Sequence, residues 1–202
     1  MITLAGAVPG DEDKIAALLA ELALFYGGSP EGTPAERSAA VRGALFGTPP
    51  LGYVLLAWDG PDLAGMAAYS FLWPAAGLTA SLYLKELYVA QAYRRAGVGR
   101  VLMDELSAIA RRRGLSRVEW TTDTPNQDAQ AFYAALGAKP LTSKIFYRAV
   151  PWTAEPPPDL ARRFVLAMAT PARISRPPPI MPGVIRSCRN AAAPSTLTTG
   201  SR

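Results

Sequence analysis

The order of elements between residues 81 and 122 constrains the fold more than any other feature of the sequence. The segment "SLYLKELYVA" has the apolar and aromatic composition of a strand, and "GRVLMDELSAIARRRG" repeats apolar residues at helical spacing. The segment "RVEWTTD" then has the composition of a second strand. A strand, a helix and a strand in this order place two parallel strands in one sheet through a right-handed crossover.

The remainder of residues 1–150 adds further strands and helices. The segments "ITLAGAV", "GYVLLAWD" and "LAGMAAYSFLW" are predicted strands, and the turn signal "DGPD" joins the last two into a hairpin. Helices are predicted from Asp11 to Gly27, over "RSAAVRGALFG" and after Asn126, and "KIFYRAV" is expected to close the domain. We therefore expect an α/β (α+β) fold with one mixed, mostly antiparallel sheet.

Charge and proline content divide the chain near residue 150. Residues 1–150 contain 14 basic and 14 acidic residues, whereas residues 151–202 contain seven arginines, two acids and ten of the 19 prolines. We expect a domain over 1–150 and a Pro/Arg-rich, mostly disordered tail over 151–202. The alternative is a basic segment that contacts an acidic partner or nucleic acid. Because aromatic residues do not alternate with these arginines, we do not expect nucleic acid as a partner.

Composition excludes several classes of site. The sequence contains no histidine and a single cysteine, Cys188, so Ser–His and Cys–His mechanisms, His-ligated metal sites and intrachain disulfides are excluded. A structural zinc site, which uses several Cys or His ligands, is not expected, and neither is another metal. No apolar run approaches the roughly 20 residues that span a bilayer. The start, "MITLAGAVPGDED", lacks the basic and apolar regions of a signal peptide. We expect a cytoplasmic protein without a membrane partner.

The segment "AYRRAGVGRVLM" combines the features of an anion-binding loop. Unpaired amides and the dipole of a helix N-terminus favour negative charge, and Gly97 and Gly99 allow close backbone approach. A dinucleotide fingerprint requires a third glycine where this chain has Leu102, and a P-loop requires Lys-Ser/Thr after Gly99. The dinucleotide-binding fingerprint is therefore excluded, and a P-loop is poorly supported. The segment is then either another kind of phosphate site or a tight turn between a strand and a helix.

The flanking sequence resembles the GNAT superfamily of N-acetyltransferases. "LYVAQAYRRAGVGRVLM" is similar to the R/Q-x-x-G-x-G/A acetyl-CoA loop, and "NQDAQAFYAALGAKP" follows at the family's spacing. The resemblance covers residues 2–149, and the strand pair in "GMAAYSFLWPAAGLTASLYLKELYV" is most similar to the diamine and polyamine acetyltransferase-like branch. It implies that a central pair of parallel strands splays around acetyl-CoA, with helices on both faces of the sheet. Family members are often dimers, so the resemblance is compatible with a homodimer.

The resemblance assigns cofactor contacts to three segments. The amides of Leu87 and Val89 would hold the pantetheine arm, and a bulge near Leu87 would direct one amide at the thioester oxygen. Asn126 either binds the pantetheine or caps the following helix. The pyrophosphate would bind to the amides of the loop Arg94, Arg95, Ala96, Gly97, Val98, Gly99 and Arg100.

Tyr133 and Glu86 are the candidate catalytic residues. In the resembling enzymes a tyrosine at the place of Tyr133 is close to the sulfur of acetyl-CoA and can protonate the thiolate, while Phe132 is expected to pack. Glu86 could accept a proton from the amine, or form an ion pair with Lys85. Lys85 stands where the polyamine enzymes carry a glutamate, which argues against a polyamine acceptor.

These observations predict an acetyl-CoA-dependent N-acetyltransferase. The expected acceptor is a primary amine of a small molecule or an amino-acid-like compound, which would attack the thioester directly. Tyr26, Tyr69 and Trp73 either line the acceptor pocket or pack in the fold. The alternative function is a non-catalytic acyl-CoA sensor or scaffold with the same fold.

Overall fold

The computed structural model describes residues 1–149, so the predicted tail and Cys188 lie outside the described residues. The chain separates into two compact units, Met1–Ala138 and Lys139–Arg202. The described part of the second unit, residues 139–149, contains a turn but no helix or strand, although it includes most of the segment expected to close the domain. The predicted boundary near residue 150 stays a prediction.

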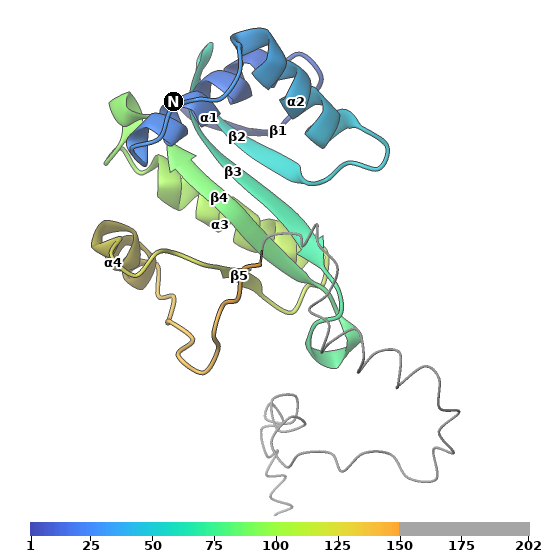
Figure 1. The fold of residues 1–202 in the computed structure, drawn as a ribbon. Helices are drawn as coiled ribbons and strands as arrows, with labels where there is room; N and C mark the ends of the chain where they lie inside the picture. Colours follow the sequence, from blue (N-terminus) through green and yellow to red (C-terminus); the bar gives the residue numbers. More distant parts are fainter. Residues whose placement is uncertain (150–202) are drawn as a thin grey trace, which may run out of the picture. The chain divides into compact units, whose positions relative to one another are not determined.

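The first unit is built on a five-stranded mixed sheet (Figure 1). Its strands are β1 (Ile2–Gly6), β2 (Tyr53–Asp59), β3 (Asp62–Leu72), β4 (Ser81–Val89) and β5 (Val118–Trp120). They lie side by side in chain order, with antiparallel pairs from β1 to β4 and a parallel pair between β4 and β5. The predicted mixed sheet with one parallel pair is confirmed. The resemblance implies a central parallel pair, but among the five described strands the pair lies at the edge of the sheet.

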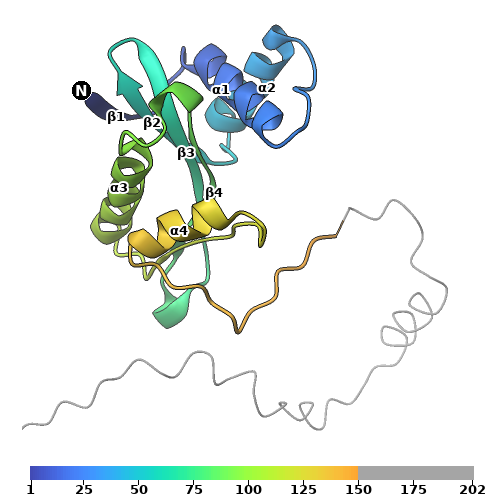
Figure 2. The ribbon, with the colours of Figure 1, turned by 90° about the vertical axis from the view of Figure 1, so that its left-hand side faces the viewer.

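Helices cover both faces of this sheet, as predicted (Figure 2). They are α1 (Glu12–Phe25), α2 (Pro34–Phe46), α3 (Val98–Arg112) and α4 (Gln127–Ala135), with short 3-10 turns η1 (Ala76–Leu78) and η2 (Gln91–Tyr93). A capping box between Thr33 and Glu36 starts α2. The buried Glu12 carboxylate connects α1 to α2 through an ion pair with Arg42 at 3.0 Å. The same carboxylate also accepts a hydrogen bond from the Gly10 amide at 2.7 Å.

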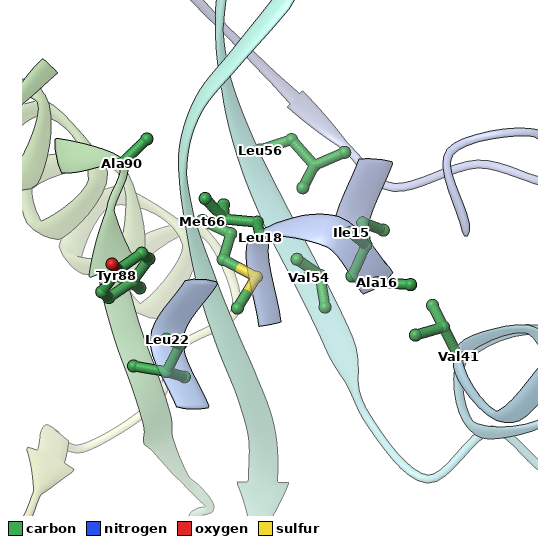
Figure 3. Packing of buried hydrophobic residues seen from close by; sticks show 10 residues of the cluster. All are labelled: Ile15, Ala16, Leu18, Leu22, Val41, Val54, Leu56, Met66, Tyr88 and Ala90. Carbon is green, nitrogen blue, oxygen red and sulfur yellow. The ribbon is translucent and has the colours of Figure 1, made fainter. Parts of the chain in front are cut away.

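Two apolar clusters fill the space between the sheet and the helices. The cluster beneath α1 and α2 contains Ile15, Ala16, Leu18, Leu22, Val41, Val54, Leu56, Met66, Tyr88 and Ala90 (Figure 3). The cluster beneath α3 is centred on Leu82, Leu84, Leu102 and Leu106 and extends to Phe132 and Tyr133 of α4. Val101 is one of the apolar residues at helical spacing in this segment, but it is 39% exposed in α3.

One extra residue in β4 changes which face its side chains occupy. Leu84 pairs with Tyr69 and Glu86 pairs with Ala68, so Lys85 has no partner in β3 and forms a bulge. Leu84 and Leu87 consequently both pack on the α3 side, three residues apart, while Tyr88 packs on the α1 side. Because side chains alternate after the bulge, Glu86 shares the face of Tyr88.

Candidate functional site

The parallel strands separate at one end of their paired region. Leu82, Tyr83 and Leu84 pair with β5, and the last five residues of β4 continue without a partner on that side. The amide of Ala90 donates to the Ala64 oxygen in the β3 strand at 2.9 Å. Since successive amides in a strand point to opposite edges, the amides of Val89 and Leu87 face the opening beyond β5. The predicted splay is present, and the bulge lies at Lys85, two residues before Leu87.

The loop between η2 and α3 presents a row of unpaired amides. Arg95 has a φ of 63° and Gly97, the N-cap of α3, has a φ of 84°, and these left-handed residues turn the chain sharply into the helix. Within residues 1–149, no backbone or side-chain acceptor is bonded to the six amides from Arg95 to Arg100. Six free donors at a helix N-terminus fit a phosphate or pyrophosphate group.

Gly99 allows this loop to approach α4 closely. A Cβ at this position would lie 3.3 Å from Cζ of Phe132 and 3.7 Å from Cγ2 of Val89. Phe132 therefore packs against the start of α3, as expected for a packing residue, and fixes the place of its neighbour Tyr133.

Tyr133 lies against Trp120 of β5, with ring centroids 4.9 Å apart. Burial first, then the negative charge of Glu86 and the neighbouring Tyr26, raises the pKa of Tyr133 to about 12. The phenol is therefore protonated at neutral pH and can donate a proton. Its packing and functional interpretations are compatible, because the half-buried ring also contributes to the core beneath α3.

Glu86 is the carboxylate nearest in sequence to the point where the strands separate. Burial raises the pKa of Glu86 above its usual value, the positive charge of Lys85 and the Leu87 amide lower it, and the negative charge of Asp123 raises it. Burial thus outweighs the opposing effect of Lys85. A half-buried carboxylate with a raised pKa is a suitable proton acceptor for an amine.

Asp123 and Tyr26 join the site from two other elements. Burial raises the pKa of Tyr26, and the charges of Glu86 and Asp123 raise it further, so the three groups lie within electrostatic range. Asp123 is in the turn before α4, where its carbonyl oxygen accepts the Asn126 amide at 3.0 Å. Sequence reasoning missed Asp123, although its position just beyond a strand that borders the opening was a usable signal.

The other predicted residues differ in what they contact. The Asn126 side chain accepts from the Ala129 amide at 3.1 Å and thus caps α4. Tyr69 stacks on Tyr53 at 5.6 Å on the α3 side of the sheet, away from the face of Glu86. Trp73 follows β3 at the end that pairs with the start of β4 and is 73% exposed. The structure therefore brings neither Tyr69 nor Trp73 to Tyr26.

Arg94, predicted to contact the cofactor, directs its guanidinium toward α1 rather than along the loop. It lies 4.3 Å from the centroid of the Phe25 ring and donates to the Tyr88 hydroxyl at 3.0 Å. Arg95 and Arg100 are exposed at the loop surface, where Arg100 approaches Asp104 at 3.8 Å.

A cavity of about 290 Å³ lies between α3, β5 and the end of α4, but no predicted site residue lines it, so we do not assign it to an acceptor. In residues 1–149, no group of three or more acidic, cysteine or histidine side chains is arranged to hold a metal ion. None of the helices in this range is both long and apolar enough to span a bilayer.

Comparison with known proteins identifies the family. The acetyltransferase (GNAT) family model matches residues 16–138. The sequence is 29% identical over 141 residues to thialysine N-epsilon-acetyltransferase of Bos taurus, covering 66% of this chain and 81% of that protein. It is also 29% identical over 77 residues to L-ornithine N5-acetyltransferase of Arabidopsis thaliana, covering 38% and 34%.

The fold is similar to that of solved structures as well. An integron cassette protein of V. cholerae superposes with a TM-score of 0.68 at 23% identity, covering 81% of this chain and 97% of that chain. This structural similarity supports the fold. The family match spans more than half of the sequence and supports the activity. The chain belongs to the GNAT acetyltransferase family and is an N-acetyltransferase.

Proposed function

We propose that this enzyme transfers an acetyl group from acetyl-CoA to the side-chain amine of a small, amino-acid-like acceptor. The GNAT family uses acetyl-CoA, which supplies an activated acetyl thioester when bound. The observation that carries the proposal is the combination of free loop amides, the opening beside β4 and four titratable side chains around that opening, Glu86, Asp123, Tyr26 and Tyr133.

The free amides from Arg95 to Arg100 fit the pyrophosphate of acetyl-CoA. The helix dipole adds to their attraction for negative charge, and Arg95 and Arg100 can contribute charged donors from the exposed side of the loop. The outward amides of Leu87 and Val89 continue this row of donors along β4 and suit the amide-containing pantetheine arm. A thioester oxygen near the bulged part of β4 would meet a backbone donor there.

Proton movement is assigned to Glu86 and Tyr133. An amine must lose a proton to attack, and Glu86 can take it directly or through water. The departing thiolate must gain a proton, and the Tyr133 phenol is protonated at neutral pH and can provide it. Burial raises the pKa of both residues, which makes the Glu86 carboxylate a better proton acceptor and keeps the Tyr133 phenol protonated.

The acceptor class is supported by charge and by the relatives. Glu86, Asp123 and the Tyr26 hydroxyl favour a cationic amine, whereas Lys85 disfavours a compound with positive charge along its entire length. The named relatives act on thialysine and ornithine, which are amino acids with a side-chain amine. We therefore expect amino acids with a side-chain amine to be better acceptors than polyamines.

An acceptor screen tests the proposal. The full chain is incubated with acetyl-CoA and with ornithine, lysine, thialysine, spermidine, an aminoglycoside or a lysine peptide, and released CoA is measured with a thiol reagent. We expect the highest kcat/KM with an amino acid that has a side-chain amine. Faster turnover of spermidine would contradict the acceptor class, and binding of acetyl-CoA without any release of CoA would favour a sensor.

A further inference from the structure

The Arg94 side chain connects the anion-binding loop to the last turn of α1. Its Nε donates to the Val89 oxygen at 3.2 Å, and its Nη2 donates to the Tyr88 hydroxyl at 3.0 Å. Its planar face covers the Phe25 ring at 4.3 Å from the centroid. These contacts use the fork of donors and the flat cation that distinguish arginine from lysine.

Glu21 completes the network from the side of α1. Its Oε1 accepts the Tyr88 hydroxyl at 3.1 Å and the Gln91 amide at 2.8 Å. Glu21 therefore fixes both the end of β4 and the start of η2 to the helix. The hydroxyl of Tyr88 lies between the two charged groups, since it donates to Glu21 and accepts from Arg94. Arg94 and Glu21 thus supply opposite charges to one hydrogen-bond network that joins α1, β4 and η2.

The network ends beside the acceptor part of the site. The ring that Arg94 covers, Phe25, contacts Tyr26 at 5.3 Å between centroids in an edge-to-face arrangement. Tyr26 lies within electrostatic range of Glu86 and Asp123. Phe25 and Tyr26 are 54% and 57% exposed, so Leu22 is the buried apolar anchor of this last turn. The contacts of Arg94 and Glu21 add the restraint on the exposed Phe25 and Tyr26 that burial does not supply.

We propose that Arg94 is a positioning residue for the acceptor: its guanidinium, held by Tyr88, fixes Phe25 and thereby Tyr26 at the acceptor side of the opening. Arg94 then affects acceptor binding more than the binding of CoA phosphates, although it begins the glycine-containing loop. This inference rests on the proposed function for the identity of the acceptor, and on the contacts of residues 21–26 and 88–94 for the role of Arg94.

Arg94→Leu and Arg95→Leu form a matched pair of variants one residue apart. Calorimetric titration with CoA measures cofactor affinity, and steady-state kinetics with the best acceptor from the screen measures KM and kcat. For Arg94→Leu we expect the acceptor KM to rise about tenfold with kcat nearly constant, the pattern of lost binding shared by ground and transition states. CoA affinity should change less than in Arg95→Leu. A larger loss of CoA affinity in Arg94→Leu than in Arg95→Leu would overturn the proposal.

A second measurement requires no acceptor. Hydrogen exchange of the last-turn amides of α1 should accelerate in Arg94→Leu but not in Arg95→Leu, because only the first substitution releases Phe25. Tyr88→Phe keeps the ring and removes the bridging hydroxyl, so it should change exchange and KM in the same direction by a smaller factor. Unchanged exchange in Arg94→Leu would refute the role of Arg94 even if no acceptor is found, which separates this failure from failure of the proposed function.

Discussion

Tyr133 has two neighbours that determine its chemistry. Trp120 and the surrounding core remove water from one side of the phenol, and Glu86 contributes negative charge from another. Both effects disfavour the phenolate, so the hydroxyl is protonated at neutral pH. Because an ordinary thiol has a lower pKa than this phenol, proton transfer to the thiolate requires the two groups to be in direct contact, which makes position as important as pKa.

Replacing Tyr133 with phenylalanine tests its proposed proton transfer. The substitution keeps the ring against Trp120 and Phe132 and removes only the hydroxyl, so the fold should be retained. We expect kcat to fall about 100-fold, within the range for loss of a general acid. Calorimetry should show CoA affinity close to that of the wild type. An unchanged kcat would remove Tyr133 from the mechanism.

The pH profile tests the roles of Glu86 and Lys85 together. A general base must be ionised, so kcat/KM should fall as the pH falls through the Glu86 pKa, which lies above its usual value. Lys85 lowers that pKa, so Lys85→Gln should move the acidic limb of the profile to higher pH. Glu86→Gln is the control and should lose this limb along with most activity. A limb that stays in place in Lys85→Gln would contradict the assignment.

At the residue scale, the sequence predicts roles that depend on backbone position better than roles that depend on side-chain direction. The glycine spacing identifies the amides from Arg95 to Arg100, because backbone donors follow from the loop itself. Arg94 belongs to the same motif, but its guanidinium turns to Phe25, which is distant in sequence. Tyr69 was an equal candidate to Tyr26, and only the pairing register shows that it occupies the opposite face.

At the element scale, α2 depends on its N-terminus more than the other long helices do. Val41 is the only buried side chain of α2, so burial contributes little to holding this helix on the fold. Thr33 and Glu36 instead satisfy each other's amides at 3.2 and 2.7 Å. The sequence predicts a helix over "RSAAVRGALFG", but the periodicity does not reveal the capping box that starts α2 earlier, at Thr33.

Thr33→Ala should therefore lower the free energy of unfolding by about 1 kcal/mol, the usual effect of losing an N-cap side chain. Urea denaturation measures this difference. Thr33→Ser keeps the hydroxyl and serves as the control, with stability expected near that of the wild type. Equal destabilisation by both substitutions would point to the lost methyl group rather than to the cap.

The loop before α3 allows a comparison of two glycines. Gly97 has a φ of 84° and open space around a built Cβ, whereas Gly99 faces Phe132 at 3.3 Å. Gly97→Ala should cost about 1–2 kcal/mol of backbone strain. Gly99→Ala should instead displace Phe132 and lower kcat by moving Tyr133. Thermal unfolding and single-turnover rates distinguish the two effects, and a stability loss confined to Gly99→Ala would contradict this explanation.

Sequence patterns are insufficient to predict where the strands end. The predicted strand "RVEWTTD" forms only over Val118–Trp120, because β5 separates from β4 at the opening and its following residues turn toward α4. Hydrophobic composition indicates that a strand exists but not where its hydrogen-bonding partner diverges. The sequence pattern does not predict the bulge at Lys85 either, since the bulge depends on the pairing register with β3.

At the scale of the whole molecule, charge and proline content predict that residues 1–150 function without the tail. A protein truncated after Val150 should bind CoA with the affinity of the full chain. Calorimetry at two salt concentrations provides the measurement, because tail arginines that contacted the phosphates would make binding to the full chain more salt-dependent. A large loss of affinity on truncation would show that residues 151–202 contribute to the site.

The bulge at Lys85 joins two halves of β4 that are out of phase with each other. Leu84 stays opposite Tyr69 and Glu86 stays opposite Ala68, because the bulge takes one extra residue out of the ladder. If Lys85 instead paired with Ala68, every following side chain of β4 would move to the opposite face of the sheet. Glu86 would then be directed at the leucines beneath α3, and Leu87 toward α1. The irregular position in β4 thus decides which face of the sheet carries the candidate base.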